Sequence, residues 1–408
     1  MPDPTVTPTE SETSPAPSAT PELQPTSAIT PTSPDEPVTI TRPGEPLAPL
    51  PAGTELILVD IWMQDALHGW ASGGSLQEPM HVLRTEDGGL TWQDVTPPEP
   101  VDGDPQYVSV VAHFLDSLQG WVTFQHAPGP QGFVTPVVWR TTDGGASWTA
   151  SEALDVSGYM GFYGPSRIGF SDPDHGWLML DLDSAMMHRY IAIYTSQDGG
   201  ATWNRVVDPQ VDAPIQTGDK TGLVMDSTGQ GLLTRDLHGL VEGVSVEMTR
   251  DGGYTWESVP LDVPGDVGAA QLCAAHSPHM FTPTSWAVGV SCLIFNETAG
   301  EDGDIWQEGE AYLFITEDAG GEWSRRDAPG GLLLYLPGDV ILSLGRDIHR
   351  SDDGGNTWTY LKTVSWDAAF SFISPEIGWA AARAEDERAL VGTVDGGRTW
   401  QEMEPRIR

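Results

Sequence analysis

Carboxylates are the most numerous chemically active side chains in this sequence, and seven of them recur in one cassette, Ser/Thr-x-Asp-x-Gly-x-Thr-Trp. Asp and Ser/Thr side chains at these offsets can hydrogen-bond nearby backbone N–H groups, and glycine tolerates the positive φ of a tight turn. We therefore predict that the cassette is a pinned hairpin with a structural role. Its aspartates and tryptophans are Asp87 and Trp92, Asp143 and Trp148, Asp198 and Trp203, Asp251 and Trp256, Asp318 and Trp323, Asp353 and Trp358, and Asp395 and Trp400.

Other catalytic patterns are missing from the sequence. It contains no G-x-S-x-G, no H-E-x-x-H, no G-x-x-x-x-G-K and no C-x-x-C. The acidic segment Glu301–Asp304, with Glu308 and Glu310, offers oxygen ligands for Ca²⁺ but lacks the ligand spacing of an EF-hand. A solvated loop is the better interpretation, so we expect no metal, no cofactor and no catalytic residue.

The net charge of −40 limits the partners of the chain. Such a charge repels phosphate backbones and anionic lipids, so we expect no nucleic-acid partner. No run of 18 apolar residues occurs, and hence no transmembrane span is expected. Residues 1–52 are rich in Thr, Pro and Ser and are predicted to form a disordered spacer. Because spacers of this kind often separate a surface anchor from a folded domain, we expect a secreted or surface-anchored protein whose signal or lipid-anchor segment precedes Met1.

The cassettes set the repeat length of the folded part, residues 53–408. Six intervals separate Asp87 from Asp395, about 51 residues each, which suits four short strands with their turns. A Gly-Trp pair recurs before the third expected strand, as Gly69-Trp70, Gly120-Trp121, Gly176-Trp177 and Gly378-Trp379. The sequence thus predicts an all-β fold of seven four-stranded antiparallel blades closed into a ring, a seven-bladed β-propeller.

The two cysteines, Cys273 and Cys292, lie 19 residues apart on strands expected to be adjacent. They could form a disulfide in an oxidising compartment or remain two buried thiols, and the sequence leaves both alternatives open.

The cassettes resemble the Asp-box, or BNR, repeat of sialidases, xyloglucanases, sortilin-type receptors and photosystem II assembly propellers. The similarity covers residues 55–404 and is strongest to the photosystem II assembly type, through phrases such as Phe372–Trp379 followed by Thr393–Trp400. It implies that the Asp box lies between the third and fourth strands, away from the binding face, and that the protein is a non-catalytic scaffold.

A sialidase would need an arginine triad and an Arg-Ile-Pro signature, whereas this chain has Arg167-Ile168-Gly169. Arg84, Arg140 and Arg350 each precede a cassette by one residue, which indicates a structural role on three different blades. A glycosidase needs two carboxylates about 5 or 6.5–9.5 Å apart, and among 59 acidic residues such a pair arises by chance. A glycan-active hydrolase, or a carbohydrate-binding module, remains the alternative function.

Loops on the face opposite the cassettes carry an apolar and aromatic cluster, which we predict to be a binding patch. The alternative is that these side chains only plug the mouth of the central tunnel. We expect a monomer that binds a protein partner, with a glycan as the alternative partner. The predicted patch consists of His126, Phe133, Tyr159, Phe162, Tyr163, Met186, Met187, His188 and Arg189.

Overall fold

The computed structural model describes residues 44–75, 80–101, 108–126, 134–159, 161, 164–185, 188–209, 213–237, 243–264, 271–295 and 306–408. All of them belong to one compact unit, Val38–Arg408. Most of the predicted spacer, residues 1–43, and the acidic segment 301–304 lie outside the described residues.

Strands in the described residues form seven consecutive groups of four, and each group is called a repeat below. Repeats one to four are β2 (Ile57–Met63), β3 (Gly69–Gly74), β4 (His81–Thr85) and β5 (Thr91–Asp94); β7 (Val108–Phe114), β8 (Gly120–His126), β9 (Trp139–Thr141) and β10 (Thr149–Ala150); β11 (Gly164–Phe170), β12 (Gly176–Ala185), β13 (His188–Ser196) and β14 (Asn204–Val207); and β15 (Asp219–Met225), β16 (Gly231–Asp236), β17 (Val244–Thr249) and β18 (Glu257–Leu261).

Repeats five to seven are β19 (Gln271–Met280), β20 (Trp286–Phe295), β21 (Trp306–Thr316) and β22 (Ser324–Ala328); β23 (Leu332–Leu336), β24 (Val340–Leu344), β25 (Asp347–Ser351) and β26 (Thr359–Thr363); and β27 (Asp367–Phe372), β28 (Gly378–Ala384), β29 (Glu387–Thr393) and β30 (Gln401–Met403). The remaining elements of the described chain are β1 (Glu45–Pro46), β6 (Pro100–Val101), β31 (Arg406–Ile407) and one 3-10 turn, η2 (Ala213–Gln216). No helix in the described ranges has the length and apolar character needed to cross a bilayer.

The repeats do not form seven separate sheets. Within the described residues, five sheets have the size of one blade: those of repeats two, three, six and seven, and that of repeat one, to which β31 adds a fifth strand. Repeats four and five share a single eight-stranded sheet, in which Asp236 of β16 pairs with Ala274 of β19. The prediction of seven separate blades is therefore wrong. The physical reason is that β19 has 10 residues, against five to seven in the other first strands, and reaches the end of β16.

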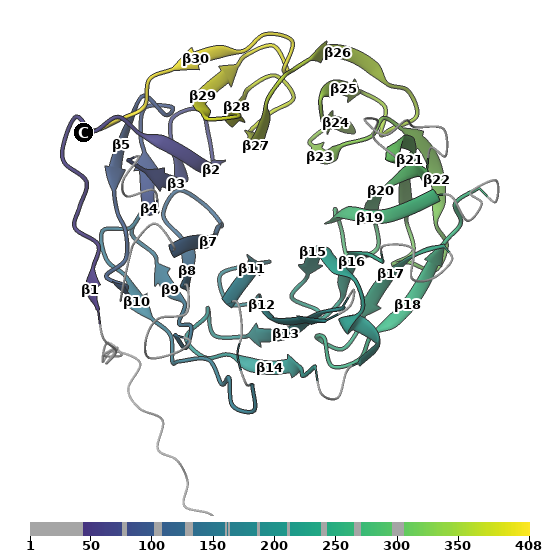
Figure 1. Cartoon of the computed structure of the whole chain (residues 1–408), viewed down its shortest axis with the longest axis horizontal. Helices are drawn as coiled ribbons and strands as arrows, with labels where there is room; N and C mark the ends of the chain where they lie inside the picture. The colour runs from purple at the N-terminus through teal and green to yellow at the C-terminus, as the bar shows by residue number, and fades with distance from the viewer. Residues whose placement is uncertain are drawn as a thin grey trace, which may run out of the picture. The chain divides into compact units, whose positions relative to one another are not determined.

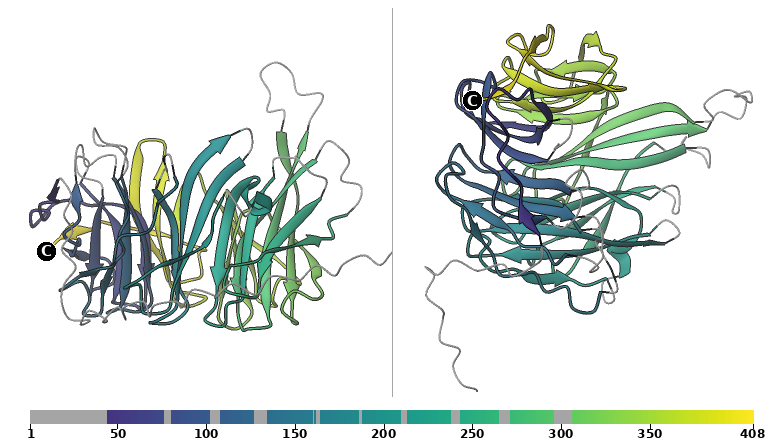
Figure 2. Two further views of the ribbon diagram at one scale, coloured as in Figure 1. Left: turned by 90° about the horizontal axis from the view of Figure 1, so that it is seen from below. Right: turned by 60° about the vertical axis from the view of Figure 1, so that its left-hand side comes forward.

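Within the unit Val38–Arg408, the repeats lie around a central opening, with the first strand of each repeat innermost (Figure 1). Side views show that the strands run roughly along the axis of this opening (Figure 2). Every repeat packs its apolar faces against the two neighbouring repeats, because a sheet exposed on both faces would leave its apolar side chains in water.

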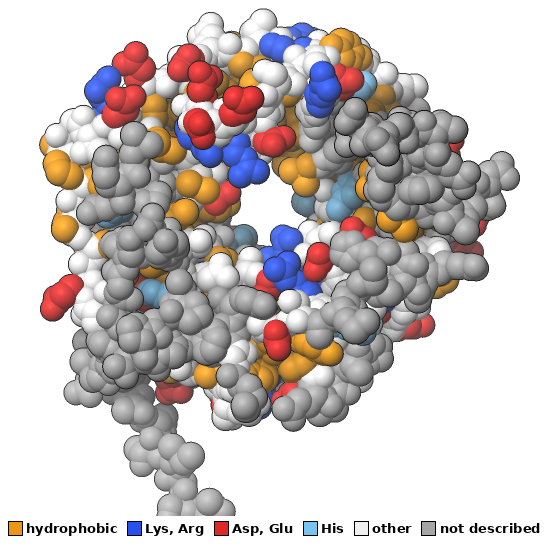
Figure 3. Space-filling view, viewed as in Figure 1, with side chains coloured by type: hydrophobic (Ala, Val, Ile, Leu, Met, Phe, Trp, Pro, Cys, Tyr) orange, Lys and Arg blue, Asp and Glu red, His pale blue; other side chains and the backbone are white. Residues whose placement is uncertain are grey.

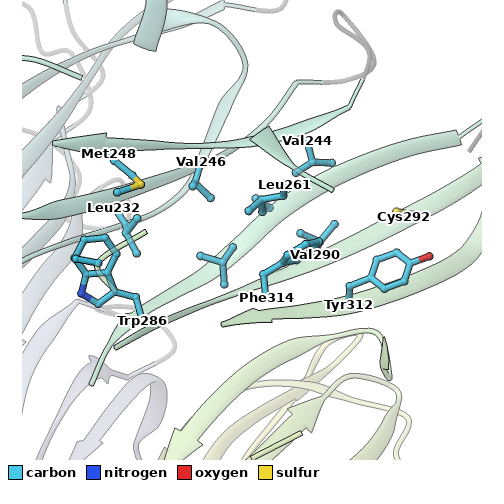
Figure 4. Close-up of a cluster of buried hydrophobic side chains, with 13 residues drawn as sticks. Leu232, Val244, Val246, Met248, Leu261, Trp286, Val290, Cys292, Tyr312 and Phe314 are labelled. Atoms are coloured by element: carbon cyan, nitrogen blue, oxygen red, sulfur yellow. The ribbon is translucent and has the colours of Figure 1, made fainter. Parts of the chain in front are cut away.

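The hydrophobic core is divided among the contacts between neighbouring repeats, which are called junctions below. The described residues form seven buried apolar clusters, one at each contact between successive repeats and one between repeat seven and repeat one. Figure 4 shows the cluster between repeats four and five, where Leu232, Val246 and Met248 pack against Trp286 and Phe314.

Repeat seven packs against repeat one to close the ring. Trp379 donates its Nε1–H to the carbonyl of Gly88, 3.0 Å away, and Met63 donates its N–H to Ser371 Oγ at 2.8 Å. The C-terminal strand β31 then pairs in parallel with β5, the outer strand of repeat one. Non-covalent contacts between the two ends of the repeat array therefore hold the ring together.

The second-strand tryptophans are more buried than the cassette tryptophans. Trp70, Trp121 and Trp286 are completely buried, whereas Trp92 is the one completely buried cassette tryptophan in the described residues. Trp121 stacks on Phe170 of the next repeat with ring centroids 3.7 Å apart, and its Nε1–H reaches the carbonyl of Gly199 at 2.7 Å.

We predict that Trp121→Ala lowers the free energy of unfolding by about 3–5 kcal/mol, because it opens a cavity at a junction and leaves the Gly199 carbonyl without its donor. Trp256→Ala is the matched control, since Trp256 is half-buried and hydrogen-bonds within its own cassette. Denaturant unfolding measures both variants. Equal losses of unfolding free energy in the two variants would contradict the conclusion that the second-strand tryptophans hold neighbouring repeats together.

Candidate functional site

Each cassette is a closed network of hydrogen bonds between the third and fourth strands. In repeat six, Asp353 Oδ1 accepts the Ser351 hydroxyl and the Thr357 N–H, both at 2.8 Å, and Oδ2 accepts the Thr357 hydroxyl at 2.7 Å. Gly355 donates its N–H to Ser351 Oγ. The side-chain and backbone hydrogen bonds from Thr357 lower the pKa of Asp353 to about 2. Both carboxylate oxygens already have donors, so this aspartate is poorly suited to catalysis or metal binding.

The other six cassettes repeat the network, and the pKa of every cassette aspartate in them is lowered as well. At Asp318 the bond from the second hydroxyl is missing, because Glu322 replaces threonine and supplies only its N–H. The cassette turn also bonds to the turn between the first and second strands, for example through Gly88 N–H and Leu67 O. These two kinds of turn therefore share one face, called the cassette face below.

The arginines that precede the cassettes contact acids and tryptophans of their own repeats, and Arg350 also hydrogen-bonds with the next repeat. Arg84 pairs with Glu86 at 2.8 Å and lies over the ring of Trp70. Arg350 pairs with Asp352 and donates to the carbonyl of Pro375 in the next repeat. Arg140 lies over Trp121. The three side chains lie in three different repeats, and Arg84 and Arg350 pair with neighbouring acids.

Four residues of the predicted binding patch lie in the described residues, and each has its own partners. His126 is buried and its Nε2 lies 2.7 Å from Glu99 Oε1. Tyr159 lies under the guanidinium of Arg205, and His188 stacks on Tyr190. Arg189 pairs with Asp181 at 3.3 Å and reaches Asp219 at 3.9 Å. The remaining patch residues, Phe133, Phe162, Tyr163, Met186 and Met187, lie outside the described residues.

Cys273 and Cys292 lie directly opposite each other in β19 and β20 and form a disulfide. The bond joins two of the longest strands in the described chain.

A pocket of about 790 Å³ lies between repeats six and seven. Its walls are the β26–β27 connection (Thr363 to Asp367), Arg346 at the β24–β25 turn, and Arg383, Glu385 and Arg388 at the β28–β29 turn. Connections between repeats and second-to-third strand turns lie at the strand ends opposite the cassettes, and this side is called the loop face below. Figure 3 shows basic and acidic side chains gathered near the ends of β27 and β28, beside the opening.

These three arginines were not predicted as site residues from the sequence. Arg346 and Arg383 are exposed, and no carboxylate forms an ion pair with either of them among the described residues. Arg388 donates to the backbone carbonyls of Glu385 and Glu387. Their rarity could have indicated a site, because the chain has only 19 Lys and Arg residues. Two of these, Arg383 and Arg388, stand five positions apart.

The described residues contain no group of three or more His, Cys, Asp or Glu side chains placed to hold a metal ion. The acidic segment 301–304, weighed above as a Ca²⁺ loop, is not among them.

Comparison with known proteins shows the architecture. One solved structure, "YCF48 bound to D1 peptide", is 19% identical, with a TM-score of 0.50, and the match covers 88% of this chain and 99% of that chain. A GH74 xyloglucanase from Xanthomonas campestris is 13% identical, with a TM-score of 0.54, and the match covers 88% of this chain and 55% of the enzyme. The fold is a β-propeller.

At the level of sequence, the propeller is 26% identical over 125 residues to a xyloglucanase from a Paenibacillus species. That stretch is 31% of this chain and 12% of the relative. No protein-family model matches the chain.

We predict that Asp353→Asn lowers the thermal midpoint of the propeller at pH 7, because the amide cannot accept the Thr357 hydroxyl at its nitrogen. The pKa of Asp353 falls from 3.8 to about 2 in the fold, so the carboxylate stabilises the native state above pH about 4 and this contribution is lost as the pH falls towards 2. The difference between variant and wild type should therefore shrink between pH 5 and pH about 2.5 in a series of melting curves. A difference in thermal midpoint that does not change with pH would contradict the conclusion that Asp353 is ionised in the folded protein.

Proposed function

We propose that the propeller is a non-catalytic, extracytoplasmic binding or assembly module that holds an acidic segment of a partner protein in the pocket between repeats six and seven. The observation that carries this proposal is the set of three arginines, Arg346, Arg383 and Arg388, around one pocket of a chain with a net charge of −40.

Charge and hydrogen bonding explain why the pocket suits a carboxylate. A guanidinium presents planar pairs of N–H donors that fit a carboxylate in a bidentate geometry. None of the three guanidinium groups forms an ion pair with an acid of the described chain, and Arg388 donates through Nη1 to two backbone carbonyls, so the remaining donors are available to a partner. The acidic remainder of the surface repels an acidic partner, which confines attraction to this pocket and makes the binding selective.

Asp367 and Glu385 also line the pocket and limit its net positive charge. They favour a partner segment that combines carboxylates with backbone or side-chain N–H donors over a simple anion. A peptide segment has both kinds of group, and we propose this as the class of partner.

Two further observations support the proposal. The solved structure described as "YCF48 bound to D1 peptide" matches this chain over 99% of its own length. Its bound peptide supports peptide binding by a propeller of this size. The disulfide between Cys273 and Cys292 is typical of proteins that work in an oxidising compartment, and this favours a secreted or surface-anchored protein.

A glycoside hydrolase is the second candidate, favoured by the 125-residue match to a xyloglucanase and by the GH74 neighbour. Turnover of xyloglucan or another β-glucan, abolished by changing one carboxylate, would replace the scaffold proposal with this one. A chain without turnover that still binds the acidic probe below supports the scaffold.

We predict that a fluorescent acidic peptide with a free carboxyl terminus binds the wild-type chain, and that Arg383→Glu with Arg388→Glu weakens this binding at least about 10-fold. Arg398→Glu is the matched control, because Arg398 is exposed on the cassette face of the same repeat. Fluorescence anisotropy measures the affinity, which should also fall as salt is raised. The proposal is wrong if the Gln/Asn version of the peptide binds equally well, or if the control loses as much affinity as the double variant.

A further inference from the structure

Guanidinium groups fill the cassette face at five junctions of the described chain, where each lies against the first glycine of the next cassette or the alanine that replaces it. Arg140, for example, stands over the ring of Trp121 and takes the space that a β-carbon on Gly199 would need. At the junction that closes the ring, Trp379 reaches the carbonyl of Gly88 instead. The five pairs are Arg84 and Gly144, Arg140 and Gly199, Arg250 and Ala319, Arg326 and Gly354, and Arg350 and Gly396.

The junction between repeats three and four has no arginine in this place among the described residues. Thr195 lies opposite Trp177 in the pairing of β12 with β13. Arg140 has that position in repeat two, opposite Trp121. A threonine side chain is too short to cross the junction. Apart from the flanking residues, no atom lies within 4 Å of the position that a β-carbon on Gly252 would take.

A pocket of about 310 Å³ lies at this junction and is lined by Trp177, Thr195 and Gly252. Tyr254 of the same cassette also lines the pocket, and its side chain is exposed. The ring of Trp177 lies against Gly169 in its own repeat, which leaves the space beside the cassette of repeat four open. The pocket therefore has the surroundings that a guanidinium group has at the other junctions.

The charges around the pocket favour a cation. Asp226 and Asp251 line it, together with His175, which is paired with Asp172, and no lysine or arginine of the described chain does so. Both oxygens of Asp251 accept hydrogen bonds within its cassette. Oδ2 of Asp226 accepts a long hydrogen bond, 3.5 Å from Gln230 Nε2. This oxygen can therefore accept a shorter, charge-assisted bond from a ligand.

We infer that the pocket between repeats three and four takes the arginine side chain of a partner protein, which completes this junction as the chain's own arginines complete the others. A planar guanidinium group can contact the aromatic rings of Trp177 and Tyr254 and donate to Asp226. The net charge of −40 attracts a basic segment of the partner to this face.

This site is independent of the proposed function. The pocket formed by Arg346, Arg383 and Arg388, called the arginine pocket below, lies on the loop face and takes an acidic segment. The pocket between repeats three and four lies on the cassette face, because cassette residues and the β15–β16 turn line it.

Ligand-observed NMR on the full chain tests the inference, with N-acetyl-arginine amide as the probe and N-acetyl-citrulline amide as its neutral isostere. The arginine probe should bind in a saturable manner with a Kd below about 10 mM, and the citrulline probe at least about 10-fold more weakly. Equal binding of the two probes, or no saturable binding of the arginine probe, would overturn the inference.

Thr195→Arg is the decisive variant, because its side chain should fill the pocket as Arg140 fills its own junction. It should abolish binding of the arginine probe. Thr142→Arg is the matched control, since it adds the same charge at an exposed cassette residue of repeat two and should bind the probe as wild type does. Binding that survives Thr195→Arg, or equal losses in both variants, would show that the probe is attracted by the general charge of the surface.

A second variant tests the acceptor without filling the pocket. Asp226→Asn should weaken binding of the arginine probe about 5-fold or more, because the amide nitrogen cannot accept the guanidinium N–H. Circular dichroism confirms that each variant is folded. Unchanged affinity in folded Asp226→Asn would contradict the assigned acceptor.

A last comparison separates a partner protein from a free amino acid. A nine-residue peptide with one central arginine among neutral residues should bind more tightly than the amide, because its backbone adds contacts at the rim. Weaker binding of the peptide would overturn the assignment of a protein partner. The acidic peptide should bind Thr195→Arg as it binds wild type, so failure at this site and failure at the arginine pocket are distinguishable.

Discussion

The contact on which the structure depends is the one between a second-strand tryptophan and the cassette of a neighbouring repeat. A four-stranded sheet of this composition cannot bury both faces by itself, so each repeat is stable only when another packs against either side. Trp121 meets the cassette carbonyl of Gly199 across one junction, and Trp379 meets that of Gly88 across the junction that closes the ring. At these two junctions the cassette network holds the accepting carbonyl in a fixed position. The cassette hairpin thereby links the hydrogen-bonded structure within one repeat to the packing of that repeat against its neighbour.

This division of labour explains where function can lie. The cassette face is occupied by hydrogen bonds that hold turns in place. The oxygens of the cassette carboxylates already have donors, so they have little capacity to bind a ligand. The loop face is shaped by the parts of each repeat that vary, namely the second-to-third strand turns and the connections. The arginine pocket arises there because repeats six and seven have short second-to-third turns, which bring Arg346 and Arg383 close to the connection Thr363 to Asp367.

Much of the fold could be predicted from the sequence because its signals are local and repeated. The cassettes lie between third and fourth strands, and β3, β8, β12 and β28 each begin at the glycine of a Gly-Trp pair. The merging of repeats four and five could not be foreseen, since it depends on how far β19 extends beside β16. The predicted binding patch relied on loop composition, and that could not show that His126 would be buried against Glu99. The arginine pocket was missed because its residues come from three separate turns and no spacing along the chain connects them.

The central claim is that an acidic partner segment engages the loop face between repeats six and seven. Hydrogen–deuterium exchange on the full chain, with and without a saturating acidic peptide, tests it most directly. The account predicts slower exchange in residues 363–367 and 383–388 and unchanged exchange in the seven cassettes. Protection confined to the cassettes, or none in these two segments while the peptide is bound, would contradict it.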